Sequence, residues 1–191
     1  VASITKPFTA TAVMQLAERG RLSIDQPIHE LLPEFAGHGK DGITLRHFLT
    51  HTSGLPEYAD DDDEIRREHR GLDAFVRSYC RGRLLFPPGS QWSYSNFGFG
   101  LAAEIVSRLG ARHYHAWVTE EILAPLGMRD SYLQPPEAAW AWWKTGKGKN
   151  GRAWSRTNTA WLDKVQTDEP LPAHVIPPDN NKPDAGGGFY G

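Results

Sequence analysis

Apolar residues at helical spacing recur along the first two thirds of the chain. The segment 7–19 carries no charge before its last two positions and is apolar almost all round, which predicts a buried helix that ends at Gly20. Segments 72–81 and 112–123 each place their large apolar residues on one face and predict two amphipathic helices. A further helical run covers 101–109. The pattern therefore predicts a largely helical first 133 residues.

Shorter elements lie between these helices. Two prolines interrupt 22–35, so we expect a turn and one short helix there. Thr44 precedes an apolar run and predicts the N-cap of a helix over 45–51 that ends near Gly54. The acidic run 60–64 is typical of a solvated helix start, because it lacks the alternating oxygens and central glycine of a calcium loop.

Composition fits a globular protein of one domain. The chain has 191 residues, of which 39% are hydrophobic and 23% charged, so it can bury a sizeable core. Its 21 basic and 23 acidic side chains leave a net charge of −2 without a basic stripe, which argues against binding nucleic acid. No uncharged run approaches membrane-spanning length. Cys80 is the only cysteine, which excludes an internal disulfide.

The first candidate chemistry is a serine and a lysine three residues apart at the start of the first helix. Ser3 and Lys6 would share one helical face within side-chain reach, so the amine could activate the hydroxyl as a nucleophile. A helix start also offers unpaired N–H groups that stabilise an oxyanion. The alternative interpretation is that Ser3 is an ordinary N-cap.

A second candidate pair is Tyr94 and Asn96, which lie in a turn-rich segment ahead of the 101–109 helix. A tyrosine at the tip of a turn can relay a proton, and an asparagine two residues later can hold a substrate amide. Their side chains would point the same way if the segment is extended.

These motifs and the phrases His51-Thr52-Ser53-Gly54-Leu55-Pro56 and Pro125-Leu126-Gly127-Met128 resemble one family. It is the serine β-lactamase and penicillin-binding-protein superfamily, in its branch of class C β-lactamases, D-alanyl-D-alanine carboxypeptidases and esterases. The resemblance covers 3–133 and returns in the glycine-rich phrase 185–188.

The resemblance implies an α+β, β-lactamase/transpeptidase-like fold. We expect a partial catalytic domain over 1–191: a nucleophile helix at 1–20, a helical lobe at 21–133, a variable loop-rich segment at 134–184 and the glycine-rich phrase at 185–191. Most sheet strands would be missing, because the family places them before the nucleophile helix and after the glycine-rich phrase. Since the chain starts at Val1, two residues before the serine motif, we expect upstream sequence to be absent.

The resemblance also assigns roles. Ser3 would be the nucleophile, Lys6 its base and Tyr94 a proton relay, while Asn96, Gly187 and Gly188 would bind substrate. No cofactor or metal is implied. The third family motif, Lys-Thr-Gly or His-x-Gly, is expected downstream of Gly191.

Four further local features each have a functional interpretation and a structural alternative. Lys144-Thr145-Gly146 matches the third motif by letter, but it precedes the glycine-rich phrase and lies among loop residues. Glu169 resembles the deacylating glutamate of class A enzymes but lacks the asparagine after it. His47 and His51 lack the intervening glutamate of a zinc-protease helix, which favours packed or hydrogen-bonded histidines. The tryptophans 140, 142 and 143 predict lobe packing, with contact to an apolar acyl chain or a sugar as the alternative.

The sequence thus predicts a serine hydrolase that forms an acyl-enzyme on a β-lactam, a D-Ala-D-Ala-type peptide or an ester. Its expected partner is a small-molecule or peptidoglycan-like substrate, and the resemblance is compatible with a cell-envelope or secreted location. The alternatives are a non-catalytic penicillin-binding-like sensor or binding module, and an incomplete, inactive fragment.

Overall fold

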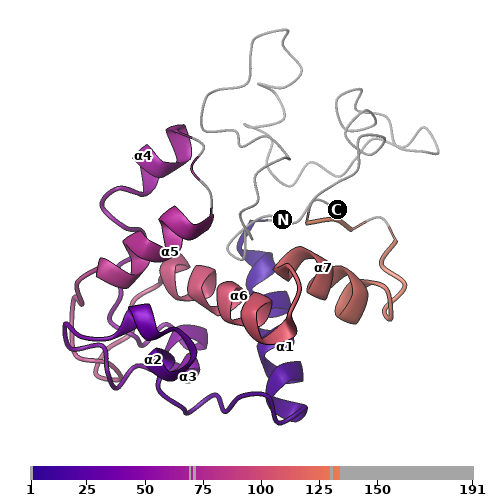
Figure 1. The fold of residues 1–191 in the computed structure, drawn as a ribbon, viewed down its shortest axis with the longest axis horizontal. Coiled ribbons are helices and arrows are strands. Elements are labelled where there is room, and N and C mark those ends of the chain that lie inside the picture. Colours follow the sequence, from indigo (N-terminus) through magenta and orange to yellow (C-terminus); the bar gives the residue numbers. More distant parts are fainter. Residues whose placement is uncertain (1, 69, 71, 130, 134–191) are drawn as a thin grey trace, which may run out of the picture.

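The computed structural model describes residues 2–68, 70, 72–129 and 131–133, and these form a body of helices around one central helix (Figure 1). The central helix is α6 (Asn96–Gly110), which contacts α1 (Thr5–Glu18), α3 (Leu45–Leu49), α5 (Leu72–Arg81) and α7 (Tyr114–Val118). The remaining elements are α2 (Ile28–Leu31), α4 (Asp62–Arg67), 3-10 turns at Ala2–Ile4 and Pro33–Phe35, and a π-helical turn at Thr119–Leu123.

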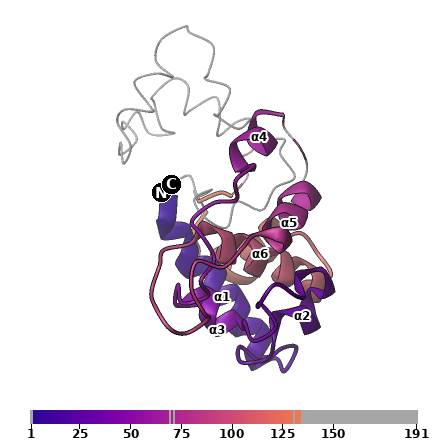
Figure 2. The same ribbon diagram turned by 90° about the vertical axis from the view of Figure 1, so that its left-hand side faces the viewer.

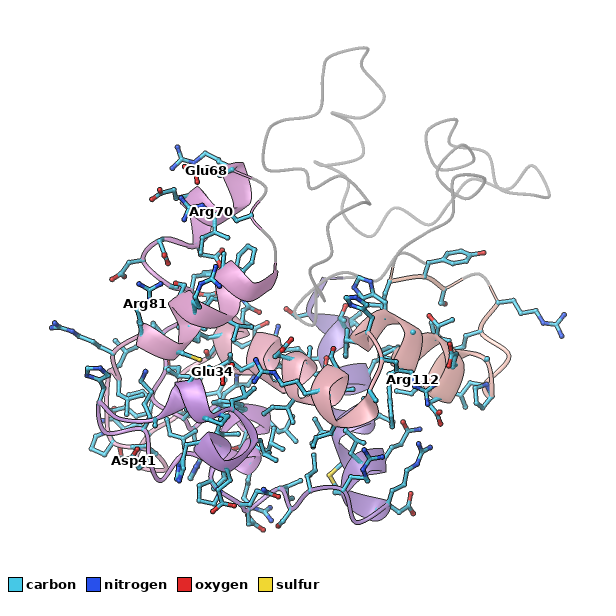
Figure 3. All side chains as sticks on the ribbon, viewed as in Figure 1. Glu34, Asp41, Glu68, Arg70, Arg81 and Arg112 are labelled. Carbon is cyan, nitrogen blue, oxygen red and sulfur yellow. The ribbon has the colours of Figure 1, made fainter. Side chains whose placement is uncertain are left out.

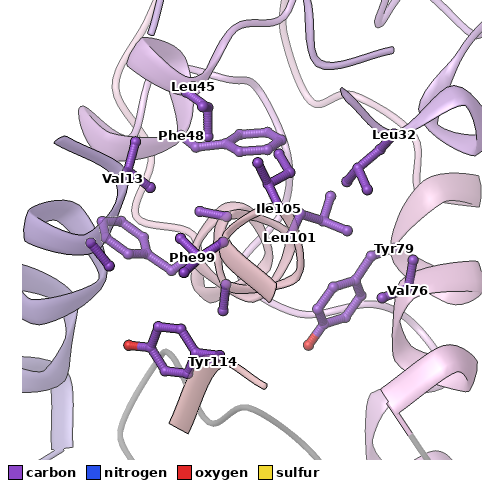
Figure 4. Close-up of a cluster of buried hydrophobic side chains, with 14 of the residues drawn as sticks. Val13, Leu32, Leu45, Phe48, Val76, Tyr79, Phe99, Leu101, Ile105 and Tyr114 are labelled. Carbon is purple, nitrogen blue, oxygen red and sulfur yellow. The ribbon is translucent and has the colours of Figure 1, made fainter. Parts of the chain in front are cut away.

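The core forms around α6 because this helix is apolar on most of its surface. Leu101 and Ile105 point from it toward side chains of the surrounding helices, among them Phe48 of α3 and Tyr79 of α5 (Figure 4). Close packing depends on Gly98, where an added Cβ would lie 2.9 Å from the Phe48 ring. Such a buried apolar centre supplies the main driving force for the fold.

Within the described residues the architecture is helical, and an isolated β-bridge joins Pro27 and Thr44. None of the helices in this part of the chain has the length and apolar character needed to cross a membrane. The sheet strands implied by the resemblance remain a prediction about sequence outside this part. The loop-rich segment and the glycine-rich phrase also lie outside it.

The first helix differs in two ways from the sequence prediction. It begins at Thr5, two residues before Pro7, because the first four N–H groups of a helix have no partner and proline loses nothing there. The expected fully buried helix is also wrong on one side: Met14 is 48% exposed, whereas Val13 and Leu16 are buried against the core.

The last predicted helix is divided. α7 ends at Val118 and a π-helical turn continues to Leu123, so the expected helix over 112–123 is shorter and irregular. Its apolar face is buried as predicted, with Tyr114 and Trp117 inside. The Tyr114 hydroxyl shares a buried 2.7 Å hydrogen bond with Thr9 of α1, which fixes α7 against α1.

The acidic run is not simply solvated, contrary to the sequence prediction. Asp62 is only 3% exposed and accepts a 2.8 Å hydrogen bond from the Tyr79 hydroxyl. Asp61 accepts a hydrogen bond from Ser78. The run therefore joins α4 to α5, although α4 lies at the edge of the helical body (Figures 1 and 2).

Asp41, Arg81 and Arg112 lie on the outside of the helical body (Figure 3), whereas Lys6, Lys40 and Asp62 are buried. Arg112 pairs with Glu120 and, at 2.8 Å, with Glu121. Exposed pairs of this kind contribute little to stability, because water screens both charges. These surface ion pairs consequently orient their own side chains and add little to the stability of the fold.

Helix α3 has the predicted N-cap. The Thr44 hydroxyl accepts a 3.5 Å hydrogen bond from the His47 N–H, and the His47 ring nitrogen Nδ1 accepts one from the Thr44 N–H at 3.1 Å. The helix ends at Leu49 rather than His51, because His51 adopts a left-handed conformation with φ of 59°.

Removing this cap should weaken the fold. We expect Thr44→Ala to lower the free energy of unfolding by about 1 kcal/mol, since the first turn of α3 would lose a hydrogen-bond acceptor. Thr11→Ala is the matched control, because the exposed Thr11 hydroxyl bonds only within α1, to the Pro7 carbonyl. Urea unfolding measures both, and equal effects would contradict a capping role.

Candidate active site

Ser3 lies in the 3-10 turn Ala2–Ile4, which runs directly into α1, and its side chain is exposed. Lys6 lies in the first turn of α1 and is only 5% exposed. The Lys6 Nζ atom lies 3.3 Å from the Ser3 Oγ atom. The three-residue spacing thus brings the amine to the hydroxyl, as the sequence predicts.

Tyr94 comes from the segment that precedes α6, ninety-one positions after Ser3. Its hydroxyl is hydrogen-bonded to the Ser3 hydroxyl, and either oxygen can be the donor. Lys6 Nζ lies 4.7 Å from the centre of the Tyr94 ring and 5.5 Å from that of Phe99. An amine and a phenol therefore both lie against Ser3 Oγ.

Asn96 is the first residue of α6 and completes the group. Its Oδ1 atom accepts a 2.5 Å hydrogen bond from Lys6 Nζ. Its Nδ2 atom donates to the Glu57 carboxylate over 3.3 Å. A side-chain amide has two N–H donors, so the second N–H of Asn96 can donate to another acceptor. The Glu57 contact orients this amide, because it fixes which end faces Lys6.

The start of α6 is fixed by its own cap. Ser95 is the N-cap, and its hydroxyl accepts from the Gly98 N–H at 3.5 Å and donates to the Pro56 carbonyl at 2.7 Å. Tyr94 and Asn96 flank this anchored residue. Both therefore reach the Ser3 and Lys6 pair. The sequence suggested an extended segment for Tyr94 and Asn96, whereas Asn96 already belongs to helix α6.

The phrase His51-Thr52-Ser53-Gly54-Leu55-Pro56 and the next residue, Glu57, hydrogen-bond to the backbone on both sides of Tyr94. The His51 carbonyl accepts from the Ser93 N–H at 2.9 Å, and the Glu57 carbonyl accepts from the Asn96 N–H at 3.1 Å. The sequence alone places the phrase in the family and indicates no structural role for it. Its role here is to hold the backbone of the second motif.

The electrostatics of the site centre on a cation surrounded by aromatic rings. Burial and the nearby positive charge of Lys6 both lower the pKa of His51. Burial likewise lowers the pKa of His47, which caps α3. Both histidines are hydrogen-bonded, as predicted, and among the described residues no cluster of three or more His, Cys, Asp or Glu is placed to hold a metal ion.

The structure thus brings together four predicted site residues: Ser3, Lys6, Tyr94 and Asn96. Gly187, Gly188, Lys144 and Glu169 lie outside the described residues. Sequence reasoning missed Glu57, Phe99 and the positions of His51. The family phrase, which contains His51 and which Glu57 directly follows, was their one sequence signal, because their contacts join segments about forty residues apart.

A family model described as Beta-lactamase matches residues 1–190 of the chain. Esterase EstB of Burkholderia gladioli is 36% identical over 145 residues, a match that covers 68% of this chain and 37% of the esterase. A penicillin-binding protein of Bacillus subtilis (strain 168) is 33% identical over 137 residues, covering 69% of this chain and 29% of that protein.

The structure of a class C beta-lactamase from Rhodobacter sphaeroides is similar, with a TM-score of 0.69 and 26% sequence identity. The match covers 99% of this chain and 46% of the lactamase. The chain thus spans less than half the length of each of these three relatives.

Proposed function

The chain belongs to the beta-lactamase family, and from this premise we propose that its protein is a serine hydrolase that forms an acyl-enzyme on Ser3. One observation carries the proposal: the Ser3 hydroxyl lies between the Tyr94 hydroxyl and the Lys6 amine. A serine hydroxyl becomes a nucleophile only when a neighbouring base accepts its proton. Two such neighbours are in place here.

In the proposed acylation, Ser3 Oγ attacks the carbonyl carbon of the substrate while its proton passes to an unprotonated Lys6. In the structure Lys6 Nζ donates to both Ser3 Oγ and Asn96 Oδ1. Once Lys6 has released one proton to solvent, the neutral amine has a lone pair that can accept the Ser3 proton and still has an N–H for Asn96. Tyr94 then relays a proton to the leaving group as the tetrahedral intermediate collapses. The products are the Ser3 ester and the protonated leaving group.

Water resolves the ester in the second half of the reaction. It gives up a proton to the same relay and adds its oxygen to the acyl carbon, and the proton returns to Ser3 Oγ as the acid leaves. The Ser3 N–H would supply one half of the oxyanion hole, and a strand outside the described residues would supply the other half. The second N–H of Asn96 would bind a substrate carbonyl.

We propose that the acyl group comes from an ester, a β-lactam or a D-Ala-D-Ala-type peptide. Two relatives carry names that point to an ester and to penicillin. The three substrate classes share an attackable carbonyl and differ in the leaving group. No contact within the described part of the site depends on the leaving group. Assays with one substrate of each class are therefore needed to identify the acyl group.

Covalent labelling tests the proposal. A fluorophosphonate probe is expected to modify the intact protein at Ser3, because the probe reports an activated serine. Ser3→Ala should abolish the adduct. Ser90→Ala is the matched control, since Ser90 is also exposed but its hydroxyl donates only to the Pro87 carbonyl. The absence of an adduct on the folded protein, by peptide mass spectrometry, would refute the proposed nucleophile.

Turnover is measured separately, with a chromogenic cephalosporin, a D-alanyl-D-alanine peptide and a nitrophenyl ester. Hydrolysis of one of them that disappears in Ser3→Ala would support a hydrolase and identify its acyl class. If each of the three substrates acylated Ser3 and the acyl group were not hydrolysed, the result would instead indicate a penicillin-binding sensor.

A further inference from the structure

His51 adopts a backbone conformation that few non-glycine residues adopt. Its φ is 59°, in the left-handed region, directly after α3. A residue held in such a conformation requires surrounding contacts that maintain it, and these often belong to functional sites. Two hydrogen bonds and two ring contacts of His51 lead to the segment that carries Tyr94.

Two hydrogen bonds from His51 flank Tyr94 in the chain. The His51 carbonyl accepts the N–H of Ser93 at 2.9 Å, and the ring nitrogen Nδ1 accepts the N–H of Ser95 at 3.1 Å. The imidazole ring also packs on the Tyr94 ring, with centroids 4.7 Å apart and planes inclined by 30°. One residue therefore restrains both the backbone and the ring of Tyr94.

The bond from Ser95 fixes the chemical state of the imidazole. An Nδ1 atom that accepts a hydrogen bond has a lone pair, so a neutral ring must carry its proton on Nε2. Protonation of Nδ1 would turn the acceptor into a donor that faces the Ser95 N–H. It would also place a second positive charge near Lys6. The side chains packed on the imidazole, Trp92, Tyr94 and Phe99, are aromatic rings and offer no carboxylate to balance that charge.

We propose that His51 is a positioning residue that sets the Tyr94 hydroxyl against Ser3, and that it does so as a neutral imidazole protonated on Nε2. The inference rests on the proposed function, because Tyr94 matters to the reaction only if Ser3 is the nucleophile. His51 touches neither Ser3 nor substrate in this scheme. Its effect on the rate passes through Tyr94.

A double-mutant cycle separates this role from a general structural one. His51→Asn suits the test because asparagine tolerates a left-handed backbone and removes the ring. We expect it to lower the second-order rate constant of fluorophosphonate labelling by about ten- to a hundredfold, as a misplaced catalytic group does. In a Tyr94→Phe background the same substitution should cost less than about twofold, because the hydroxyl it positions is already absent.

A loss of the same size in both backgrounds would overturn the proposal, since it would show an effect that does not pass through the Tyr94 hydroxyl. Unchanged labelling in His51→Asn would overturn it as well. If wild-type Ser3 takes no label, the proposed function fails, and the arrangement of His51 is tested by the measurement that follows.

Nitrogen NMR of the wild-type protein needs no variant. At pH 7.5 we expect His51 Nδ1 to be unprotonated and Nε2 to carry the proton. As the pH is lowered, the amide signal of Ser95 should shift together with the protonation of His51. A proton on Nδ1 at pH 7.5, or a Ser95 signal that ignores the titration, would refute the inferred tautomer.

Discussion

Replacing Lys6 with methionine is expected to slow acylation of Ser3 by about 10²–10⁴-fold, the usual contribution of a general base. Methionine is similar in length to lysine and apolar, so it should fit the space beside Tyr94 and Phe99. It has no lone pair basic enough to accept the Ser3 proton. The rate constant of fluorophosphonate labelling measures the loss, and circular dichroism checks the fold.

Lys40→Met is the matched control, because Lys40 is also a buried lysine. Its amine donates to the Cys80 carbonyl and lies 5.1 Å from the centre of the Phe35 ring, away from the Ser3 contacts. Burial lowers the pKa of Lys40. We expect this variant to be less stable by about 1–3 kcal/mol, since the Cys80 carbonyl loses its donor, and to be labelled at the wild-type rate.

The two lysine variants should thus have opposite effects. Lys6→Met should lose labelling, whereas Lys40→Met should lose stability and keep labelling. If Lys6→Met were labelled as fast as the wild type, the amine would not be the base. The Ser3 proton would then have to pass to Tyr94, the other polar neighbour of Ser3 Oγ.

The second large effect is expected for Gly54→Ala, which should lower the free energy of unfolding by about 2–5 kcal/mol. Gly54 has a φ of 79°, and an added Cβ would overlap the Phe86 carbonyl oxygen. The two segments cannot separate freely, because the Gly54 carbonyl accepts the Leu85 N–H at 2.7 Å. Urea unfolding measures the loss.

Two glycines separate the causes of this loss. Gly37 also has a positive φ, of 82°, but an added Cβ would meet nothing within 4 Å, so Gly37→Ala should cost only the backbone strain of about 1–2 kcal/mol. Gly42 has open space and no positive φ, so Gly42→Ala should be neutral or slightly stabilising. Equal losses for Gly54→Ala and Gly37→Ala would show that the Phe86 overlap relaxes at no cost.

Gly54→Ala should also reduce Ser3 labelling, whereas Gly37→Ala should not. Gly54 lies between His51 and Glu57, whose backbone carbonyls accept the N–H groups of Ser93 and Asn96. A shift of this segment would move the second motif relative to Ser3. Labelling rates at a temperature where each variant is folded distinguish this effect from lost stability.

The sequence by itself determined the elements whose signals are local. Helical periodicity predicted α5 with the bounds that the structure has, and Thr44 predicted the cap of α3. The spacing of Ser3 and Lys6 predicted that amine and hydroxyl would meet, because helix geometry alone brings residues three apart together. The two family motifs predicted which side chains to examine.

Only the tertiary structure decided how those side chains meet. Tyr94 reaches Ser3 from ninety-one positions away, and the amide of Asn96 accepts from Lys6 through Oδ1 while it donates to Glu57 through Nδ2. The acidic run 60–64 likewise gave no sign that Asp62 would be buried and hydrogen-bonded to Tyr79. Such contacts depend on how helices pack around α6, and no local pattern encodes the relative placement of segments that are distant in the chain.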